Sequence, residues 1–494
     1  MLMALSAMHH LEVPDIRVET LVDQPPNQDG EFILYWMTAF RRTEYNFALQ
    51  RAAWWAAHLG KPLVVLEPLR VGYRWASDRF QQFVVDGMRD NAASLSKYQV
   101  TYYPYLEHRR GEGSGLIEQL AKNASVVVGD HYPCFFLRNL PQWFARRSPC
   151  RFEIIDSNGL MPLRIPDKTF TVAHSYRRFM QKQVDHVLAT PPLSKPLEAL
   201  RIPELKALPA SLLKRWPMAQ EVTKSKEYDW STFDIDHEVK PTAHAGGRQE
   251  ALKRWKQFLK QGCDRYNEDR NHPDTDGSTH LSPYLHFGHI SAHEMLQGIL
   301  EHESFSRDQL SRPNGKVNGF WNLSESAEAF LDQLLTWREI GFNQCFRDDH
   351  YDRYDSLPSW ARASLAKHAK DKRQYLYSLQ QFESAQTHDP LWNAAQRQLL
   401  QDGRIHNYLR MLWGKKILHW SASPQEALDI MVELNNKYAL DGRDPNSYSG
   451  IFWVLGRYDR PWGPEREIFG SIRYMTSDST LKKVRTKTYL QRYR

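Results

Sequence analysis

Residues 32–66 read FILYWMTAFRRTEYNFALQRAAWWAAHLGKPLVVL, and this stretch decides the fold of the N-terminal part of the chain. It places a segment of helical length, residues 45–59, between two short apolar runs at 32–36 and 63–66. Three further apolar runs follow, at 100–103, 126–128 and 152–155. Short apolar runs separated by helices are typical of a parallel sheet with helices on both faces. We therefore predict a Rossmann-like α/β domain over residues 31–180, after a loose tail over residues 1–30.

The turn that follows the first predicted strand lacks the glycine pattern of a dinucleotide-binding fold. Such folds carry GxGxxG at this place, so that backbone N–H groups reach a pyrophosphate. Residues 37–42 read MTAFRR instead. We expect this domain to hold an accessory chromophore or no ligand.

The rest of the chain changes character in two steps. Residues 181–245 contain proline-bearing and polar stretches, which indicate an interdomain connection. After Gly246 and Gly247 the pattern is helical, beginning with Leu252, Trp255 and Phe258 on one face. We predict a helical domain over residues 246–494, and hence an α/β domain joined to an all-α domain.

Bulk properties exclude several classes of protein. A length of 494 residues favours two or three domains, and 41% hydrophobic with 25% charged residues is ordinary for a globular protein. No apolar run reaches the length of a membrane span, so we expect no membrane association. The four cysteines match no CxxC spacing, so we expect a reduced, cytoplasmic protein without a metal site. The net charge of +7 is compatible with a polyanionic partner.

Residues 266–291, YNEDRNHPDTDGSTHLSPYLHFGHIS, are the first candidate for a ligand site. The hydroxyl residues Ser278, Thr279 and Ser282 surround an expected transition from loop to helix. Exposed N–H groups at a helix start, together with hydroxyls, suit a pyrophosphate, but the same residues also suit plain helix capping. From the residues alone, both interpretations stay open.

Residues 388–420, HDPLWNAAQRQLLQDGRIHNYLRMLWGKKILHW, contain the second candidate. Asn407 and Arg410 are three residues apart and share a helix face, and Asp441 is a possible ion-pair partner for Arg410. Trp413 and Trp420 are seven residues apart, about 10 Å along a helix, where aromatic residues usually pack in a core. A structural ion pair and a structural core are therefore the simple interpretations.

These blocks resemble the photolyase/cryptochrome family, whose FAD-binding segment has the LSPYLHFG core with an upstream tyrosine and paired hydroxyls. The helix FLDQLLTWREIGFN at 330–343 resembles the family helix between flavin and DNA lesion. Four segments closely resemble class II cyclobutane pyrimidine dimer photolyases. They are the 388–420 block, LNNKYALDGRDPNSYSGIFW at 434–453, DRPWG at 459–463 and GSIRYM at 470–475. The resemblance is dense between residues 266 and 475 and thinner in the N-terminal domain.

The resemblance implies a reduced FAD cofactor, FADH⁻, and an antenna chromophore that is a deazaflavin or is absent. It implies that Arg410 and Asp441 lie against the isoalloxazine ring and that Asn435 lies near flavin N5, where a helix C-cap is the simpler interpretation. The implied cofactor-binding residues are Tyr266, Arg270, Ser278, Thr279, Leu281, Ser282, Asn407, Arg410 and Asp441.

The resemblance also implies an electron-hopping chain of Trp413, Trp392 and Trp420, and a pocket for a flipped lesion. Trp337 and Trp453 would line that pocket, with Trp462 as a further candidate. Arg473 would fill the gap left in the duplex, and Arg404, Lys415 and Lys416 would contact DNA phosphates. Gln333 stands where the family has a lesion-facing glutamate, and we expect Gln333 and Asn435 to act in catalysis. Tyr458 stands where many members have histidine.

The implied activity is light-dependent repair of cyclobutane pyrimidine dimers by a carbon–carbon lyase. We expect a monomer that binds UV-damaged DNA, nucleoid-associated in a bacterium or nuclear in a eukaryote. Two alternatives stay open: a cryptochrome-like FAD photoreceptor without repair activity, and a photolyase for pyrimidine(6-4)pyrimidone products. A more remote alternative is a DNA-binding protein that has lost its flavin.

Overall fold

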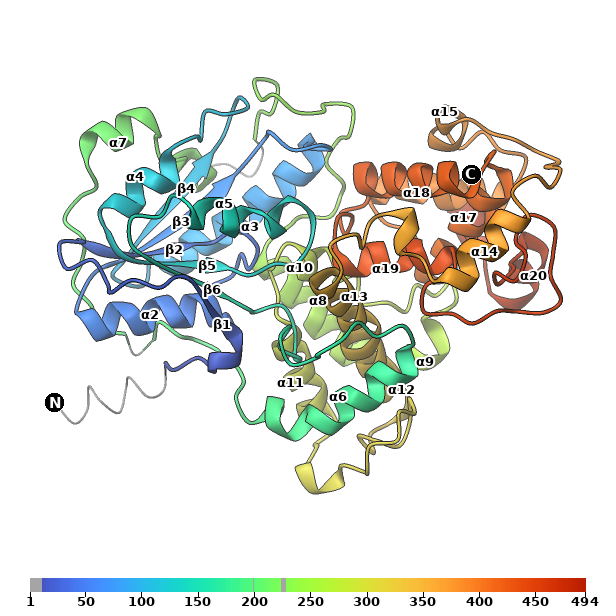
Figure 1. Ribbon diagram of the computed structural model, residues 1–494, viewed down its shortest axis with the longest axis horizontal. Helices are drawn as coiled ribbons and strands as arrows, with labels where there is room; N and C mark the ends of the chain where they lie inside the picture. The colour runs from blue at the N-terminus through green and yellow to red at the C-terminus, as the bar shows by residue number, and fades with distance from the viewer. Residues whose placement is uncertain (1–10, 199, 224–227) are drawn as a thin grey trace. The chain divides into compact units, whose positions relative to one another are not determined.

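The computed structural model describes residues 11–198, 200–223 and 228–494 (Figure 1). The chain divides into two compact units, each discontinuous in sequence. The first comprises Met1–Asp167, Val184–Trp255 and Leu281–Gly298, and the second Lys168–Gln183, Lys256–His280 and Ile299–Arg494. Residues 1–10 of the predicted tail and 224–227 of the predicted connection lie outside the described residues. The continuous domain boundaries drawn from the sequence stay a prediction.

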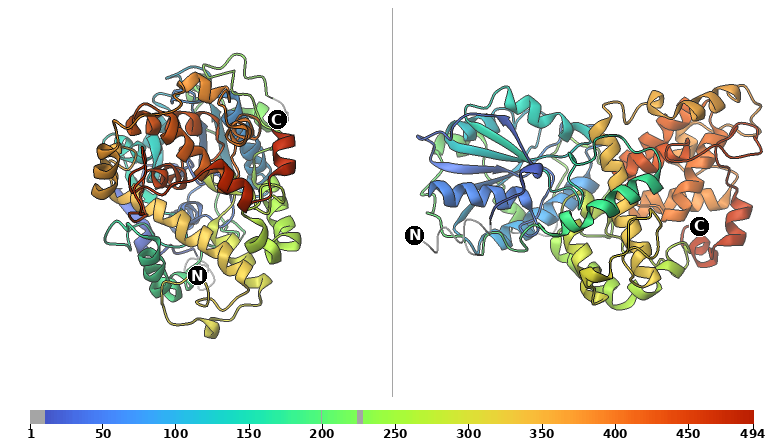
Figure 2. Two further views of the ribbon diagram at one scale, coloured as in Figure 1. Left: turned by 90° about the vertical axis from the view of Figure 1, so that its right-hand side faces the viewer. Right: turned by 60° about the horizontal axis from the view of Figure 1, so that its bottom comes forward.

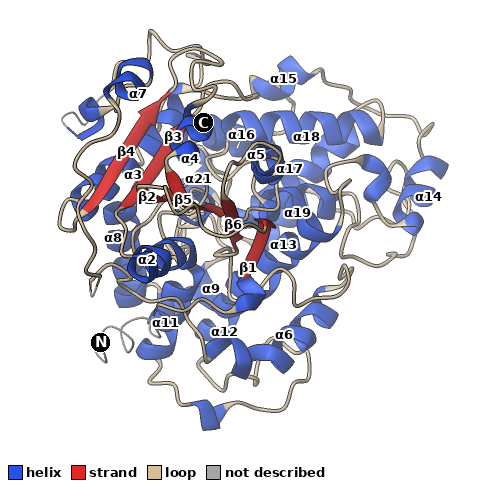
Figure 3. Cartoon of the chain, turned by 60° about the vertical axis from the view of Figure 1, so that its left-hand side comes forward, coloured by secondary structure: helices blue, strands red, loops and turns tan. Residues whose placement is uncertain are grey.

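The first unit is built on a six-stranded sheet in the order β1-β6-β5-β2-β3-β4 (Figure 3). Neighbouring strands from β6 to β4 pair in parallel, and β1 pairs antiparallel with β6 at the edge. All five apolar runs of the sequence are strands, which confirms the predicted α/β part of the fold. The strands are β1 (Val18–Val22), β2 (Phe32–Trp36), β3 (Leu63–Leu69), β4 (Val100–Leu106), β5 (Ala124–Asp130) and β6 (Arg151–Ile155).

Both faces of the sheet are covered, which explains why β2 is apolar at every position. Side chains alternate between faces, so Phe32, Leu34 and Trp36 point to one side, where they join a core with α4, α5 and α7. On the opposite side, Arg51 and Trp55 of α2 bond to Glu153 of β6. The helices that lie wholly in this unit are α2 (Phe47–Leu59), α3 (Asp78–Leu95), α4 (Leu116–Lys122), α5 (Leu140–Ala145), α7 (Ala210–Arg215) and α10 (Ser282–His286).

The residues expected to form an interdomain connection belong to the α/β core. Leu212 of α7 and the following Trp216 pack against the sheet, and Trp230 and Phe233 pack on a second cluster with α3. These apolar residues are widely spaced between prolines and charges. The composition of the segment therefore did not indicate that these residues are buried.

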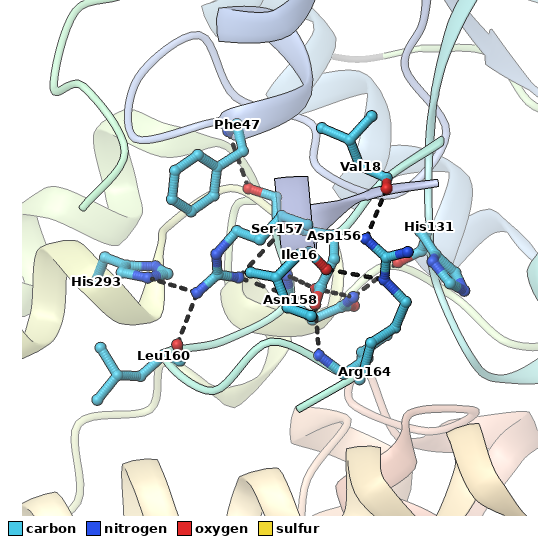
Figure 4. A network of polar contacts seen from close by, with 12 residues as sticks. Ile16, Val18, Phe47, His131, Asp156, Ser157, Asn158, Leu160, Arg164 and His293 are labelled. Atoms are coloured by element: carbon cyan, nitrogen blue, oxygen red, sulfur yellow. Dashed lines mark hydrogen bonds and ion pairs between the residues drawn. The ribbon is translucent and has the colours of Figure 1, made fainter. Parts of the chain in front are cut away.

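The sequence prediction of a loose tail is wrong for residues 15–22, which form the short helix η1 (Asp15–Arg17) and strand β1. Figure 4 shows why this segment is ordered. The buried guanidinium of Arg17 donates to the carbonyl of Leu160 at 2.6 Å and lies 3.5 Å from His293 Nε2. Arg164 in turn donates to the carbonyls of Ile16 and Val18. The pairing partners are 139 or more residues away, a distance that no local pattern reveals.

The turn after β2 holds a carboxylate of the protein itself. The backbone N–H groups of Thr38, Ala39 and Phe40 all donate to Oδ2 of Asp130 at 2.7–3.0 Å, and Tyr35 donates to Oδ1. Three successive N–H groups that converge on one oxygen form an anion-binding nest. The place where a dinucleotide-binding fold holds a phosphate is therefore filled by Asp130, at the end of the neighbouring strand β5.

The segment Leu281–Gly298 lies close against the α/β core of the first unit. Gly288 has a left-handed φ of +74°, and a Cβ built there would lie 2.1 Å from the carbonyl oxygen of Ala39. Its own carbonyl accepts a hydrogen bond from the fully buried Arg42 at 3.1 Å. Only glycine permits both this backbone conformation and this close approach. The glycine of the LSPYLHFG core thus has a structural function.

The second unit is helical, as the pattern after Gly247 predicts (Figure 2). Among the described residues, no helix of the structure has both the length and the apolar character of a membrane span. The helices of this unit are α9 (Tyr266–Asp269), α12 (Glu325–Leu331), α13 (Arg338–Arg347), α14 (Ser359–Lys367), α15 (Leu379–Glu383), α16 (Pro390–Asp402), α17 (Asn407–Trp420), α18 (Pro424–Tyr438), α19 (Pro445–Val454), α20 (Ser477–Lys483) and α21 (Lys487–Arg492). Three further helices, α6 (Ala173–Leu188), α8 (Arg248–Gln261) and α11 (Ala292–His302), extend from one unit into the other.

Candidate functional site

The loop that follows α9 is organised around Asp276. Its carboxylate accepts from Arg404 at 2.8 Å and pairs with His280 Nε2 at 3.2 Å. Burial alone would raise the pKa of Asp276, but the hydrogen bonds from His280 and Arg404 hold it well below its usual range. Asp276 and His280 both have left-handed φ values, 45° and 55°. Strained backbone of this kind persists only where surrounding contacts hold it, and it clusters at functional sites.

The predicted cofactor residues of this loop lie around Asp276 and on α9. Ser278 Oγ is 3.5 Å from Asp276 Oδ1. Tyr266 is buried between Phe258 and Phe330, and the Arg270 guanidinium lies 5.7 Å from the centre of its ring. Burial raises the pKa of Tyr266, so the phenol stays protonated.

Leu281 and Ser282 lie in the first unit, where Leu281 is the N-cap of α10 and Ser282 its first residue. No side chain caps this helix. The interpretation of the hydroxyls as a plain N-cap is therefore wrong at α10. Their predicted role as cofactor ligands stays a prediction.

Four side chains in and beside this loop have buried polar atoms without a hydrogen-bond partner among the described residues. They are Nε of Arg270, Nδ1 of His280, Nε of Arg404 and both ring nitrogens of His406. Buried polar atoms are nearly always paired, so a cluster of unpaired donors and acceptors indicates a missing polar partner. An anionic, hydroxyl-rich group such as a flavin dinucleotide fits this donor set.

The ion pair predicted between Arg410 and Asp441 is present, with Nη2 at 3.1 and 3.2 Å from the two carboxylate oxygens. Arg410 lies on α17, and Asn407, on the same face one turn earlier, is exposed. Asn435 is buried on α18 and donates to Ser447 Oγ at 2.6 Å. Because α18 continues to Tyr438, the C-cap interpretation of Asn435 is wrong.

Three tryptophans form one buried contact chain between α16 and α17. Trp392 donates its indole N–H to the carbonyl of Trp413 at 3.0 Å, and its ring centre lies 6.2 Å from that of Trp420. Trp413 donates to Gln396 Oε1 at 2.9 Å. The order of contact is therefore Trp413, Trp392, Trp420, and it begins three residues after Arg410 on the same helix.

The 330–343 segment contains a π-helical turn, η6 (Asp332–Trp337), between α12 and α13. The sequence predicted one continuous α-helix here. The Trp337 indole donates to Asp332 Oδ2 at 3.0 Å, and Asp332 is paired with Arg177 at 2.6 Å. A π-turn changes the direction in which side chains leave a helix, and such turns frequently mark functional sites.

Trp337 stacks face to face on Trp453 of α19, with ring centres 4.3 Å apart and an interplanar angle of 14°. Gln333 lies one turn before Trp337 and is half-buried. Tyr458 is buried in the cluster that includes Ile340 and touches Trp337, and its hydroxyl is 3.2 Å from Ser449 Oγ. Gln333 is therefore a neighbour of Trp337 along the helix, and Tyr458 belongs to the cluster against which Trp337 packs.

Several known proteins resemble the chain over most of its length. No family model matches the chain. The "Deoxyribodipyrimidine photo-lyase" of Methanothermobacter thermautotrophicus is 31% identical over 481 residues, which cover 97% of this chain and 98% of that protein. The protein of the same name from Arabidopsis thaliana is 30% identical, with 94% and 90% covered.

The chain belongs to the deoxyribodipyrimidine photo-lyase family. It is therefore a lyase of the DNA-repair class, as the resemblance predicted. A solved bacterial class III photolyase from Agrobacterium tumefaciens shares the fold, with a TM-score of 0.65, 16% identity, and 94% of this chain and 87% of that chain covered.

Two guanidinium groups flank an exposed tryptophan of the second unit. Trp462 is 40% exposed, and the guanidinium groups of Arg473 and Arg460 lie 5.3 and 5.8 Å from its ring centre. Its indole N–H donates to Asp459 at 3.0 Å. An exposed ring flanked by guanidinium groups suits stacking on unpaired bases.

Three of the cations that we expected to contact DNA phosphates are not on the surface of this photo-lyase. Arg404 is mostly buried and bonded to Asp276, and the fully buried Lys415 donates to the carbonyl of Val454 at 2.5 Å. Lys416 lies over the ring of Trp420 at 5.0 Å. Sequence patterns show charge but not burial, so they could not reveal these inward positions.

Sequence reasoning also missed Asp276, His280, His406 and Asp332, which surround the predicted site residues. Their positions in the sequence could have indicated three of these residues. Asp276 and His280 flank the hydroxyl pair Ser278 and Thr279, and His406 directly precedes Asn407. Asp332 had no comparable signal, because its role depends on the π-turn.

Proposed function

We propose that the protein repairs cyclobutane pyrimidine dimers in DNA by light-driven electron transfer from reduced FAD, as a class II photolyase and as a monomer. The observation that carries this proposal is the buried chain of Trp413, Trp392 and Trp420, which begins on the helix that presents Arg410. Trp392 contacts the backbone of Trp413 and its ring centre lies 6.2 Å from that of Trp420, and closely spaced, buried indoles suit electron hopping. The 30–31% identity to proteins named photo-lyase supports the same function.

The residues that would hold FAD are Arg270, Ser278, Thr279, Asn407, Arg410 and Asp441, together with Tyr266, Leu281 and Ser282. When bound, the reduced flavin supplies one electron to the dimer after it absorbs light. Arg410 contributes a fixed positive charge, which favours an anionic reduced cofactor, and Asp441 fixes the orientation of that charge. The hydrogen bond to Ser447 fixes the orientation of the Asn435 amide. The amide would then hydrogen-bond to a donor or acceptor atom near flavin N5.

The lesion would reach the site by leaving the duplex. Photolyases act on an extruded target, and damaged bases cost less to unstack. Trp337 and Trp453 present two flat indole faces to such a target, once their mutual stack opens. The Gln333 amide would donate to the carbonyl that gains negative charge, as a preorganised dipole does in other active sites. Arg473 would occupy the gap in the duplex, and Trp462 is a further candidate for lining the pocket.

The test is to purify the protein, record its absorption spectrum and reduce it under illumination. Loss of cyclobutane dimers from UV-treated oligonucleotide is then measured in light and in darkness. We expect flavin absorption and light-dependent dimer loss. Flavin absorption with no repair of either lesion type would instead identify a photoreceptor, and repair of (6-4) products alone would identify the other photolyase class.

A further inference from the structure

The N-terminus of α17 lies beside the Asp276 cluster and has no side-chain cap. The helix is 14 residues long, so its first turn carries backbone N–H groups without intrahelical partners and the positive end of the helix dipole. Such a terminus attracts an anion, but alone it does not identify one. The N-cap residue His406 supplies the second observation.

The imidazole of His406 is buried, with 3% of its surface exposed, and neither ring nitrogen has a hydrogen-bond partner among the described residues. Burial lowers the pKa of His406 to about 4, so the ring is neutral at physiological pH. A neutral imidazole carries one N–H donor and one acceptor nitrogen. Leaving both unpaired in the interior destabilises a protein, unless a ligand completes them.

The surroundings of His406 are rigid and rich in donors. Its backbone N–H donates to Gln398 Oε1 at 2.8 Å, and the same oxygen accepts from Tyr489 of α21 at 2.9 Å. Arg404, two residues earlier, and His280 are both held by Asp276, and each keeps one further nitrogen without a partner in the described part of the chain. The C-terminal helix thus braces a cluster that keeps two spare donors, the Nε–H of Arg404 and one ring N–H of His406.

We infer that the diphosphate of the flavin dinucleotide binds at the N-terminus of α17, with His406 donating a hydrogen bond to a phosphate oxygen and with Arg404 as the flanking donor. This inference rests on the proposed function and deepens it. It assigns a binding role to two residues that the sequence did not predict as cofactor ligands, His406 and Arg404, and it moves Arg404 from the DNA to the cofactor.

The charges of the cluster favour an anion over a metal ion. Asp276 is the acidic residue bonded within it, and its carboxylate is already engaged by the Arg404 guanidinium and by His280. A divalent cation would need that carboxylate and would lie beside a fixed positive charge. A diphosphate instead completes the donors and benefits from the helix dipole.

Three variants of the flavin-loaded protein test the inference: His406→Phe, His406→Gln and the control His419→Phe. His419 is a suitable control because it lies near the other end of α17. Burial lowers its pKa to about 4 as well, and its Nδ1 also has no partner among the described residues. The readouts are the phosphorus NMR resonances of the bound FAD and the rate of FAD release, followed by flavin fluorescence.

We expect His406→Phe to shift the diphosphate resonances and to raise the release rate about tenfold to a hundredfold, the effect of one hydrogen bond to a charged group. His406→Gln keeps a donor and is expected to stay within about fivefold of the unaltered protein. His419→Phe is expected to change neither readout. If His406→Phe does not fold, a shifted resonance with near-normal retention in His406→Gln supports the same assignment.

Different results would contradict the proposed function and the assignment of His406. An unaltered protein that binds no flavin overturns the proposed function. An unaltered protein that binds flavin, with resonances and release rates unchanged in both His406 variants, overturns the assignment of His406 and leaves the proposed function standing. Equal loss of FAD in the His406→Phe and His419→Phe variants shows a general packing effect and also overturns the assignment.

Discussion

The two ends of helix α17 differ in how they satisfy their polar atoms. At the N-terminal end, His406 and its neighbours Arg404 and His280 have buried nitrogens without partners among the described residues. Toward the C-terminal end, the indole N–H groups of Trp413 and of the adjacent Trp392 are both bonded within the protein. The polar atoms at the first end are expected to be completed by a ligand, whereas the indole N–H groups of the aromatic chain are bonded within the protein, and only His419 near that end keeps a ring nitrogen without a partner among the described residues of α17. One helix thus joins a binding site to a self-contained aromatic chain.

A substitution that interrupts the aromatic chain is expected to have the largest effect. Trp413→Phe removes the indole that lies three residues after Arg410 on α17. We expect photoreduction of the flavin to be lost, while repair by chemically reduced protein is retained, because the chain serves only to regenerate the reduced cofactor. Absorption changes under illumination and a dimer-loss assay measure the two activities.

Trp321→Phe is the matched control, because Trp321 is equally buried and packs only against Phe305 and Phe320 among the aromatic contacts found. It is expected to change neither activity. Equal loss of photoreduction and repair in Trp413→Phe would refute the division of labour between chain and site.

The stacked indoles of Trp337 and Trp453 differ in burial from the indoles of the electron chain. The stacked pair is half-exposed, whereas the electron chain is buried. We expect Trp453→Ala to weaken binding of dimer-containing DNA about fivefold to a hundredfold, the usual worth of stacking one base on an aromatic ring. Binding of undamaged duplex is expected to change little. Fluorescence anisotropy with both duplexes measures the difference.

Trp143→Ala serves as the control, since Trp143 is a partly buried tryptophan of the first unit with Arg147 over its ring. A uniform loss of affinity for both duplexes in Trp453→Ala would show that the ring supports the fold rather than the lesion.

The variant Asp276→Asn tests the polar cluster at the N-terminal end of α17. It removes the charge that holds Arg404 and His280, and we expect a loss of about 1–3 kcal/mol in the free energy of unfolding near neutral pH. Because the folded-state pKa of Asp276 is lowered, its stabilising effect is present above the ordinary carboxyl pKa of about 4 and is lost as the pH falls below that value. Urea unfolding of both proteins from about pH 7 to pH 3 measures this difference.

A gap between the two proteins that stays constant down to the lowest pH would contradict the ionised state of Asp276. The variant Asp274→Asn is the control, because Asp274 belongs to the same loop but accepts from the backbone N–H of Tyr489.

Arg473→Gln is expected to have the smallest effect, because Arg473 is a partly exposed cation whereas Arg404 is mostly buried. We expect affinity for a dimer-containing duplex to fall by at most about fivefold, as for other solvent-exposed charge contacts. Affinity for a single-stranded oligonucleotide with the same dimer is expected to stay unchanged, since no gap exists there. A larger loss with the single strand would place Arg473 against the lesion itself.

The sequence predicted those features that depend on neighbouring residues. The apolar runs from Phe32 to Ile155 are strands, and the heptad spacing of Trp413 and Trp420 lies on one helix. It did not predict β1, the π-turn at Asp332 or the burial of Arg404. These depend on partners such as Leu160, Arg177 and Asp276, which are more than 100 positions away in the chain. Long-range pairing of a charge leaves no local pattern.

The nest that holds Asp130 has a consequence for engineering. Three N–H groups and the Tyr35 hydroxyl are aimed at one carboxylate, and they would remain aimed at the same point if the side chain were shortened to glycine. The vacated space would match formate or acetate in shape and charge. An Asp130→Gly variant is therefore expected to bind a small carboxylate in the α/β unit, and chemical complementation by formate or acetate would test this.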